Sequence, residues 1–282
     1  MPSITHPRCV RSAMRPDRSR FRSRSYPGRW GIPTVAFDGS QGAVSRDGKT
    51  LVLAAAATGA PLRARSSFRV LRTSNLRTRA EVVLRGDFAF DALSPDGSRL
   101  YLIQHVSEAN LSRYVVRLFD VERNRLLPGR IADRTQRGWV MEGLPVTRET
   151  SADGRWAYTL YTRPGGYPFV HALDTVRGVA HCVGIPWTGN QDRVWQLRMT
   201  LRDGGRTLGV HWRSGREYLA IARDTWRISY PAPARADAGG SGYPWWTTGL
   251  AGAAALLAAA SVAGGARRRR LARREVPVGA AN

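Results

Sequence analysis

The sequence contains little lysine, little cysteine and few acidic residues, and each shortage narrows the classes of protein to consider. Lys49 is the only lysine among 44 basic residues, and 21 acidic residues leave a formal net charge of +23. Cys9 and Cys182 are the only cysteines, which is too few for a disulfide framework. The chain is therefore not a small disulfide-stapled scaffold, and its basic character rests almost entirely on arginine.

The known catalytic and nucleotide-binding motifs are absent as well. The chain has no G-x-S-x-G elbow, no G-x-G-x-x-G loop, no Walker-type loop and no H-E-x-x-H pair. His171, His181 and Cys182 form the only local group of metal-ligating residue types, and they lack zinc-finger spacing. We therefore expect no catalytic residue, no cofactor and no metal site.

The positive charge is spread along the chain. Residues 1–30 hold eight Arg and one Asp, giving +7, and the stretch from Arg267 onward holds six Arg and one Glu, giving +5. Such an excess of arginine is typical of compositional bias, whereas a phosphate-binding face needs clustered arginine with base-reading partners. No recognition motif of that kind is present, so we expect no nucleic-acid partner.

What the chain does contain is one long uncharged run near its end. Residues 245–266 hold no charged side chain, begin with two tryptophans and are followed directly by four arginines, Arg267 to Arg270. Twenty-two residues of helix would cross a hydrocarbon core of about 30 Å. We expect one transmembrane helix here, with membrane contact through residues 245–266; the alternative is a buried Ala-rich core helix.

The flanking charges predict the orientation of this helix. Arginine-rich flanks stay in the cytoplasm, so residues 267–282 form a basic cytoplasmic tail and the larger N-terminal part lies outside the cell membrane. Export of that part needs a signal peptide, and residues 1–30 contain no apolar stretch of the required length. We expect residues 1–30 to be a disordered Arg-rich segment, and we infer a misassigned start with a signal peptide encoded upstream.

A repeat of about fifty residues occupies the middle of the chain. Four copies of an Asp-Gly turn, each leading into an apolar strand, place Asp47, Asp96, Asp153 and Asp203 at spacings of 49, 57 and 50 residues. Asp accepts backbone N–H groups within such a turn and Gly supplies a positive φ. These aspartates are therefore expected to be structural and not catalytic.

Each repeat continues with three further apolar segments. A strand beginning with an aromatic residue follows the turn, and in three repeats it ends at an acidic residue, Asp120, Asp174 or Asp224. A short third strand comes next, at residues 81–84, 130–132, 179–185 and 226–229. A fourth leads into the next turn, at residues 88–93, 144–147 and 196–201. Four antiparallel strands per repeat of this length predict propeller blades.

The S-x-D-G-x-x-L turn followed by an aromatic strand ending in Asp resembles the repeats of bacterial WD40-like, TolB-type and lactonase-like β-propellers over residues 34–230. The resemblance implies an all-β fold, a small or incomplete β-propeller of about four blades. Such families usually have six or seven blades, so the ring is small, lacks an N-terminal blade or is open. A β-sandwich is the alternative fold.

The sequence thus divides into five parts: a disordered segment at 1–30, a propeller-like domain at 31–230, a Pro/Ala/Gly linker at 231–244, the transmembrane helix at 245–266 and the tail at 267–282. We expect a single-pass protein of the cell membrane whose extracytoplasmic domain binds or scaffolds a protein or cell-envelope partner. The alternative is a lactonase-like or other hydrolytic propeller, which requires His105, His171 and His211, or several carboxylates, to converge. The loop at 163–168, with Tyr167 at its tip, is a candidate for ligand contact.

Overall fold

The computed structural model describes residues 23–56, 62–133 and 140–231. These residues belong to the first of two compact units, which ends at Pro231; the second unit lies outside the described residues. The predicted transmembrane run at 245–266 and the tail at 267–282 are therefore outside the described part as well. Within that part, no helix is long and apolar enough to span a membrane.

The first two sheets are antiparallel meanders whose strands pair in chain order. The first sheet consists of β1 (Trp30–Gly31), β2 (Thr50–Ala55), β3 (Arg65–Arg72) and β4 (Thr78–Arg85). The second sheet consists of β5 (Phe88–Leu93), β6 (Arg99–His105), β7 (Arg113–Asp120) and β8 (Arg125–Leu126), and β9 (Met141–Glu142) also pairs with β7.

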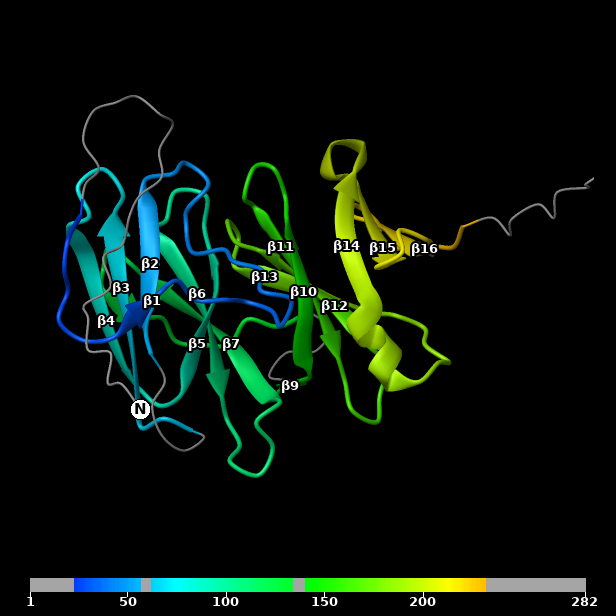
Figure 1. The fold of residues 1–282 in the computed structure, drawn as a ribbon, viewed down its shortest axis with the longest axis horizontal. Helices are drawn as coiled ribbons and strands as arrows, with labels where there is room; N and C mark the ends of the chain where they lie inside the picture. The colour runs from blue at the N-terminus through cyan, green and yellow to red at the C-terminus, as the bar shows by residue number, and fades with distance from the viewer. Residues whose placement is uncertain (1–22, 57–61, 134–139, 232–282) are drawn as a thin grey trace, which may run out of the picture. The chain divides into compact units, whose positions relative to one another are not determined.

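The third and fourth sheets repeat this plan (Figure 1). The third consists of β10 (Leu144–Thr150), β11 (Trp156–Thr162), β12 (Phe169–Asp174) and β13 (Val179–Gly184). The fourth is preceded by the 3-10 helix η2 (Gln191–Gln196) and contains β14 (Leu197–Arg202), β15 (Thr207–Trp212), β16 (Glu217–Ala222) and β17 (Ile228–Ser229). The all-β prediction is confirmed. The described residues form four separate sheets, whereas the alternative fold, a β-sandwich, requires two facing sheets.

The Asp-Gly turns join the first strand of a repeat to the second, as the sequence predicts. In the first three copies the aspartate accepts the backbone N–H two residues ahead, at 3.0 Å in each case, and the hydroxyl of the serine two residues before it. The same serine oxygen accepts a backbone N–H at the start of the following strand. Each turn is therefore closed by its own side chains.

Two local sequence predictions, one of a turn and one of a strand, are wrong. The fourth turn, which holds an extra glycine, folds instead as the short 3-10 helix η3 (Asp203–Gly205), and all three of its residues have a positive φ. Residues 130–132, predicted as a strand, contribute one isolated bridge, at Ile131, and the outermost pairing of the second sheet lies earlier, at β8. The sequence pattern therefore predicts the third strand of that repeat about five residues too late.

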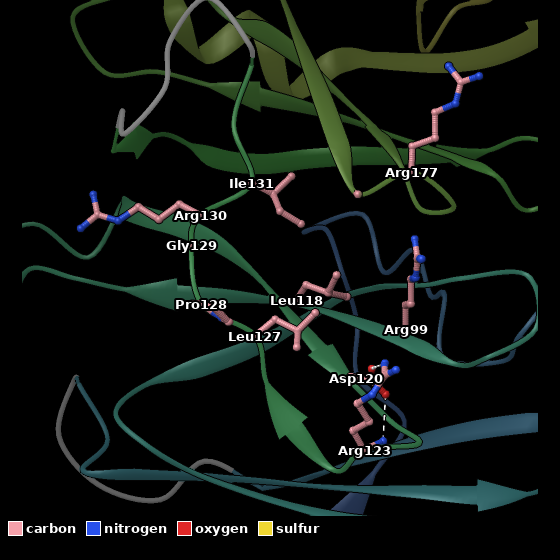
Figure 2. A pocket seen from close by; sticks show the side chains of 11 residues that line it. Arg99, Leu118, Asp120, Arg123, Leu127, Pro128, Gly129, Arg130, Ile131 and Arg177 are labelled. Carbon is pink, nitrogen blue, oxygen red and sulfur yellow. Dashed lines mark hydrogen bonds and ion pairs between the residues drawn. The ribbon is translucent and has the colours of Figure 1, made fainter.

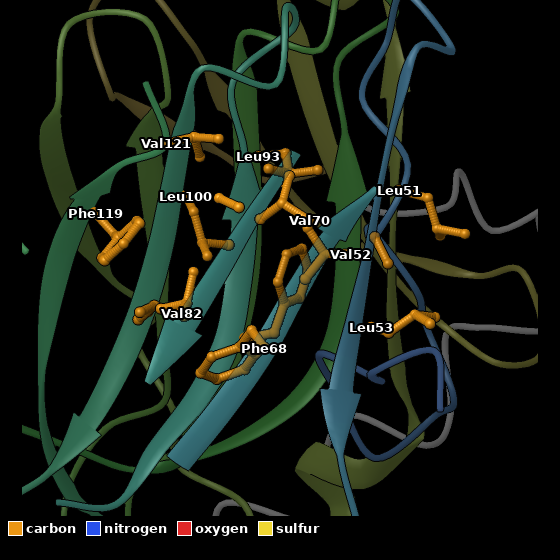
Figure 3. Packing of buried hydrophobic residues seen from close by; sticks show 14 of the residues in the cluster. Leu51, Val52, Leu53, Phe68, Val70, Val82, Leu93, Leu100, Phe119 and Val121 are labelled. Carbon is orange, nitrogen blue, oxygen red and sulfur yellow. The ribbon is translucent and has the colours of Figure 1, made fainter. Parts of the chain in front are cut away.

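One apolar cluster fills each contact between consecutive sheets. The first is built largely from the inner and middle strands of the first two sheets, with Val52, Phe68, Val70 and Leu100 buried (Figure 3). A second cluster joins the second and third sheets, and a third joins the third and fourth sheets. Each internal sheet packs an apolar cluster on both of its faces, which explains why its middle strands are rich in apolar residues.

The first sheet extends into the segment that we expected to be disordered. Tyr26 and Trp30 pack against the first apolar cluster, and the guanidinium of Arg69 lies 4.7 Å from the centre of each ring. Glu81 pairs with the same guanidinium at 2.9 Å. Residues 23–30 are thus tied to β3 and β4 by aromatic and ionic contacts.

Candidate functional site

The second and third sheets carry a cavity at each end of their strands. In β6 and β7, Arg99 pairs with Asp120 at the end that holds the Asp-Gly turns, and His105 pairs with Tyr114 at the opposite end. We name these the turn end and the loop end. An apolar recess of about 430 Å³ lies at the loop end, and an arginine-lined pocket of about 370 Å³ lies at the turn end.

A short hairpin forms one wall of the apolar recess. Thr34 bridges Gln41, and Asp38 accepts the backbone N–H and the hydroxyl of Ser40 at 3.0 and 2.5 Å. Gly39 follows Asp38 with a φ of +86°, so this is another Asp-Gly turn closed by its own side chain. We call residues 34–41 the inserted hairpin.

The inserted hairpin is held by strands that lie far from it in the sequence. The backbone N–H of Phe37 donates to the carbonyl of Pro145 in β10 at 3.0 Å. The Asp38 carboxylate lies 4.0 Å from the guanidinium of Arg198 in β14. Burial raises the pKa of Asp38, but its bonds to Ser40 and Thr147 and the charge of Arg198 outweigh burial and hold that pKa below its ordinary value. The hairpin therefore bridges the innermost strands of the third and fourth sheets.

Phe37 projects at the tip of this hairpin. Its ring meets the edge of the Trp195 ring at a centroid distance of 5.5 Å, yet 68% of the residue is exposed. Leu111, on the loop between β6 and β7, is 44% exposed and lines the same recess. Two large apolar side chains thus flank a mainly apolar cavity, which is the usual composition of a binding site.

A histidine supplies the main polar group of the recess. The Nδ1 atom of His105 lies 3.5 Å from a carboxylate oxygen of Asp87, whose other oxygen accepts the Arg63 Nε–H at 2.6 Å. Burial lowers the pKa of His105, Asp87 opposes that shift, and Arg63 adds to it. The imidazole is therefore neutral at pH 7, and it can offer one N–H and one acceptor nitrogen.

The histidines singled out from the sequence do not gather at one site. His105 lies in the second sheet, His171 in the third and His211 in the fourth. Within the described part of the chain, no three His, Cys, Asp or Glu residues are placed to hold a metal ion. His171 and Cys182 do lie together, with Nδ1 and Sγ 3.6 Å apart, and His181 lies 3.4 Å from Asp133.

His171 and Cys182 form part of a buried polar layer between the second and third sheets. Burial lowers the pKa of His171 to about 4 and raises the pKa of the Cys182 thiol to about 12. A thiol with so high a pKa is a poor nucleophile at neutral pH. Asp91 and Arg148, whose charges act on the pKa of His171, pair with each other, and Asp133 accepts the backbone N–H of Cys182 at 2.9 Å.

The loop at residues 163–168 turns through Gly165 and is anchored by Gln191, whose amide donates to the carbonyl of Gly166 at 2.7 Å. Tyr167 at its tip is 64% exposed. The loop begins at the end of β11, whose Thr162 pairs with Leu144, a residue that lines the apolar recess. Its aromatic tip is therefore free to meet a ligand at the loop end.

The inserted hairpin was missed by sequence reasoning. Its signal was available, because Asp38 and Gly39 form an Asp-Gly pair just before the first repeat. The pair lies outside the fifty-residue spacing, so the repeat pattern did not include it. Asp91 carried a signal too, as a lone charge within the apolar strand Phe88–Leu93.

Comparison with solved structures finds β-propeller proteins. TolB from Acinetobacter baumannii matches at 16% identity with a TM-score of 0.39, over 76% of this chain and 46% of that one. The β-propeller domain of the Trilobed protease from Pyrococcus furiosus matches at 13% identity with a TM-score of 0.40, over 72% and 55%. A putative TolB from Agrobacterium tumefaciens matches at 13% identity with a TM-score of 0.35, over 75% and 83%.

The chain spans about half the length of the first two of these proteins. No family model matches the sequence, and a search of curated proteins finds no match either. Likenesses of this strength say nothing about a ligand or an activity. The all-β, blade-like organisation of this chain therefore rests on its own four sheets.

Proposed function

We propose that this protein is a membrane-anchored, extracytoplasmic propeller-type binding module, and that it captures an apolar side chain of a protein partner in the apolar recess. The observation that carries the proposal is the pairing of an exposed Phe37 with a 430 Å³ cavity. Exposed aromatic residues beside apolar cavities are typical of interaction sites.

The attachment of the inserted hairpin supports this function. Phe37 is fixed through its own backbone N–H to Pro145 and through its ring to Trp195. An anchor that is already positioned loses little conformational entropy when a partner binds. His105 and Thr34 supply polar side-chain groups to the recess. Tyr114 and Tyr161 line it as buried aromatic residues, and the other lining residues are apolar or glycine.

Photo-crosslinking in the native host tests the site directly. A photoreactive residue at position 37 should give a discrete protein adduct, and one at position 83 should not, because Val83 is also exposed but lies on β4 away from the recess. Phe37→Ser together with Leu111→Ser should lower partner capture at least tenfold, with Val83→Ser as the matched control. Equal crosslinking at both positions would contradict the assignment.

Membrane attachment through residues 245–266 is part of the proposal, with residues 267–282 in the cytoplasm. The uncharged run and the arginines after it support this orientation. The chain should sediment with membranes and dissolve only in detergent, whereas a variant ending at residue 244 should not sediment. Protease added to intact cells, or to spheroplasts where an outer layer intervenes, should digest the propeller-type domain. Protection until lysis would contradict the orientation.

The hydrolytic alternative requires a catalytic base in the same recess. Hydrolysis there would need His105 as the base, because it is the histidine that lines the cavity. Turnover of lactone or peptide-ester substrates that is lost in His105→Gln, with folding intact, would favour an enzyme over a binding module. The binding proposal expects no such turnover.

A further inference from the structure

The second cavity, at the turn end, has a composition unlike that of the apolar recess. Its lining comes from the start of β6, the end of β7, the segment after β8 and the turn after β12. It contains four arginines and one carboxylate, set around three half-buried apolar side chains, Leu118, Leu127 and Ile131 (Figure 2). Arginines that border an apolar floor suit a ligand with both an anionic and an apolar part.

The single carboxylate of this pocket is already engaged. Asp120 accepts the side chain of Arg123 at 2.7 Å and the backbone N–H groups of Glu122 and Arg123 at 3.0 and 2.9 Å. These bonds from Arg123 hold the pKa of Asp120 below its ordinary value. Asp120 therefore neutralises the charge of Arg123. Little of its negative charge remains to neutralise the other three arginines.

Arg99 and Arg177 both line the pocket and carry positive charge. The Arg99 guanidinium donates to the backbone carbonyl of Val176, an uncharged acceptor, and this bond places it beside the turn that carries Arg177. Among the described residues, neither arginine has a carboxylate partner. In Figure 2 both side chains lie on one side of the apolar floor, with the guanidinium of Arg177 pointing away from it, whereas that of Arg130 extends to the other side.

From this arrangement we infer that the turn-end pocket binds a small organic anion, with a carboxylate or phosphate held by Arg99 and by the exposed side chain of Arg177 once it turns toward the pocket, and an apolar body on Leu118, Leu127 and Ile131. Two guanidinium groups, one from a strand and one from a turn, can bind the two or more oxygens of one such anion. The volume of 370 Å³ lies within the range of small-molecule sites. The site is separate from the apolar recess and does not depend on the function proposed there.

Calorimetric titration of the full chain in neutral detergent tests this site. Phenyl phosphate and benzoate represent the two anionic groups, benzyl alcohol represents the apolar body alone, and inorganic phosphate represents the anion alone. We expect at least one of the aryl anions to bind at least tenfold more tightly than both benzyl alcohol and inorganic phosphate. Raising the salt concentration should weaken the binding of the anions and leave that of the alcohol unchanged.

Two double variants separate this site from a general charge effect. Arg99→Met with Arg177→Met should weaken aryl-anion binding at least tenfold. Arg72→Met with Arg85→Met removes the same charge from exposed positions in the first sheet and should change binding less than twofold. Equal losses in both variants, or no binding of either aryl anion at millimolar concentration, would overturn the inference.

A single variant covers the case in which the loss of Arg99 impairs folding. Arg177 is exposed and its side chain makes no bond within the described part of the chain, so Arg177→Glu should leave the thermal unfolding midpoint unchanged. We expect this reversal of charge to weaken binding of the aryl anion at least tenfold. Unchanged binding in a folded Arg177→Glu variant would overturn the inference as well.

Discussion

Asp91 and Arg148 form an ion pair that is buried between the innermost strands of the second and third sheets. Their side chains are 1% and 4% exposed, and they lie 57 residues apart in the sequence. Asp91 sits at a β-bulge in β5, where the register shifts between Phe90 and Ala92. A bulge redirects a side chain that would otherwise follow the alternation of the strand.

The first prediction concerns this ion pair. Asp91→Asn should lower the free energy of unfolding by about 3–5 kcal/mol, because the buried Arg148 charge would lose its partner. Asp91→Leu combined with Arg148→Met should recover part of that loss, since no buried charge remains. Arg123→Met, which removes an arginine that is 70% exposed from its own ion pair, should change the free energy of unfolding far less than Asp91→Asn does. Urea denaturation measures all three, and a double variant less stable than Asp91→Asn would contradict the explanation.

A second prediction compares two glycines in equivalent turns. Gly48 and Gly97 have φ values of +70° and +68°, but a Cβ on Gly97 would lie 2.4 Å from the Thr50 hydroxyl oxygen and 2.5 Å from its Cβ, whereas Gly48 faces open space. Gly48→Ala should cost about 1–2 kcal/mol for the left-handed backbone alone. Gly97→Ala adds the clash and should cost about 3–5 kcal/mol. Similar unfolding midpoints for the two variants would show that the turns are not packed together.

The third prediction concerns pH. Burial lowers the pKa of His171 to about 4, against an unfolded value of 6.5, and Arg148 adds to this shift while Asp91 opposes it. Between these pH values the unfolded chain binds a proton that the folded chain does not. Stability is therefore full above pH 6.5 and should fall by roughly 3 kcal/mol as the pH drops to 4.

The variant His171→Gln isolates this contribution, because carboxylates that titrate in the same range remain in both proteins. Its stability should fall less steeply than that of the natural protein between pH 6.5 and 4, whatever its absolute value at pH 7. Parallel curves of unfolding free energy against pH would mean that the pKa of His171 is the same in the folded and unfolded states, and would contradict the prediction.

A fourth prediction tests the arginine between Tyr26 and Trp30. Arg69→Met should lower the free energy of unfolding by about 1–3 kcal/mol, because two ring contacts and the pair with Glu81 are lost from a side chain that is 15% exposed. The stability of Arg69→Lys should lie between that of the natural protein and that of Arg69→Met, since lysine keeps the charge but not the planar stacking. Arg72→Met, at the exposed end of the same strand, should change stability by less than about 0.5 kcal/mol. Urea denaturation followed by tryptophan fluorescence measures the unfolding free energy of each variant.

The sequence alone determined the order of the strands and the position of the turns. Asp96 and Gly97 specify a turn through bonds within a few residues, and the apolar run at 169–174 specifies a buried strand wherever it lies. Local hydrogen bonding and hydrophobic alternation depend on neighbours in the chain, so they can be read without knowing the fold. Where a turn held an extra glycine, at Asp203, the same rules gave the right place but the wrong local shape.

The tertiary structure alone decided which residues share a site. Phe37 meets Pro145 and Trp195, Arg99 meets Val176, and Asp91 meets Arg148, and no local pattern relates the members of these pairs. Such contacts depend on how whole sheets pack on one another, which is governed by the apolar clusters between them. The fold class follows from short-range chemistry, whereas both candidate binding sites arise only where the second and third sheets are brought together.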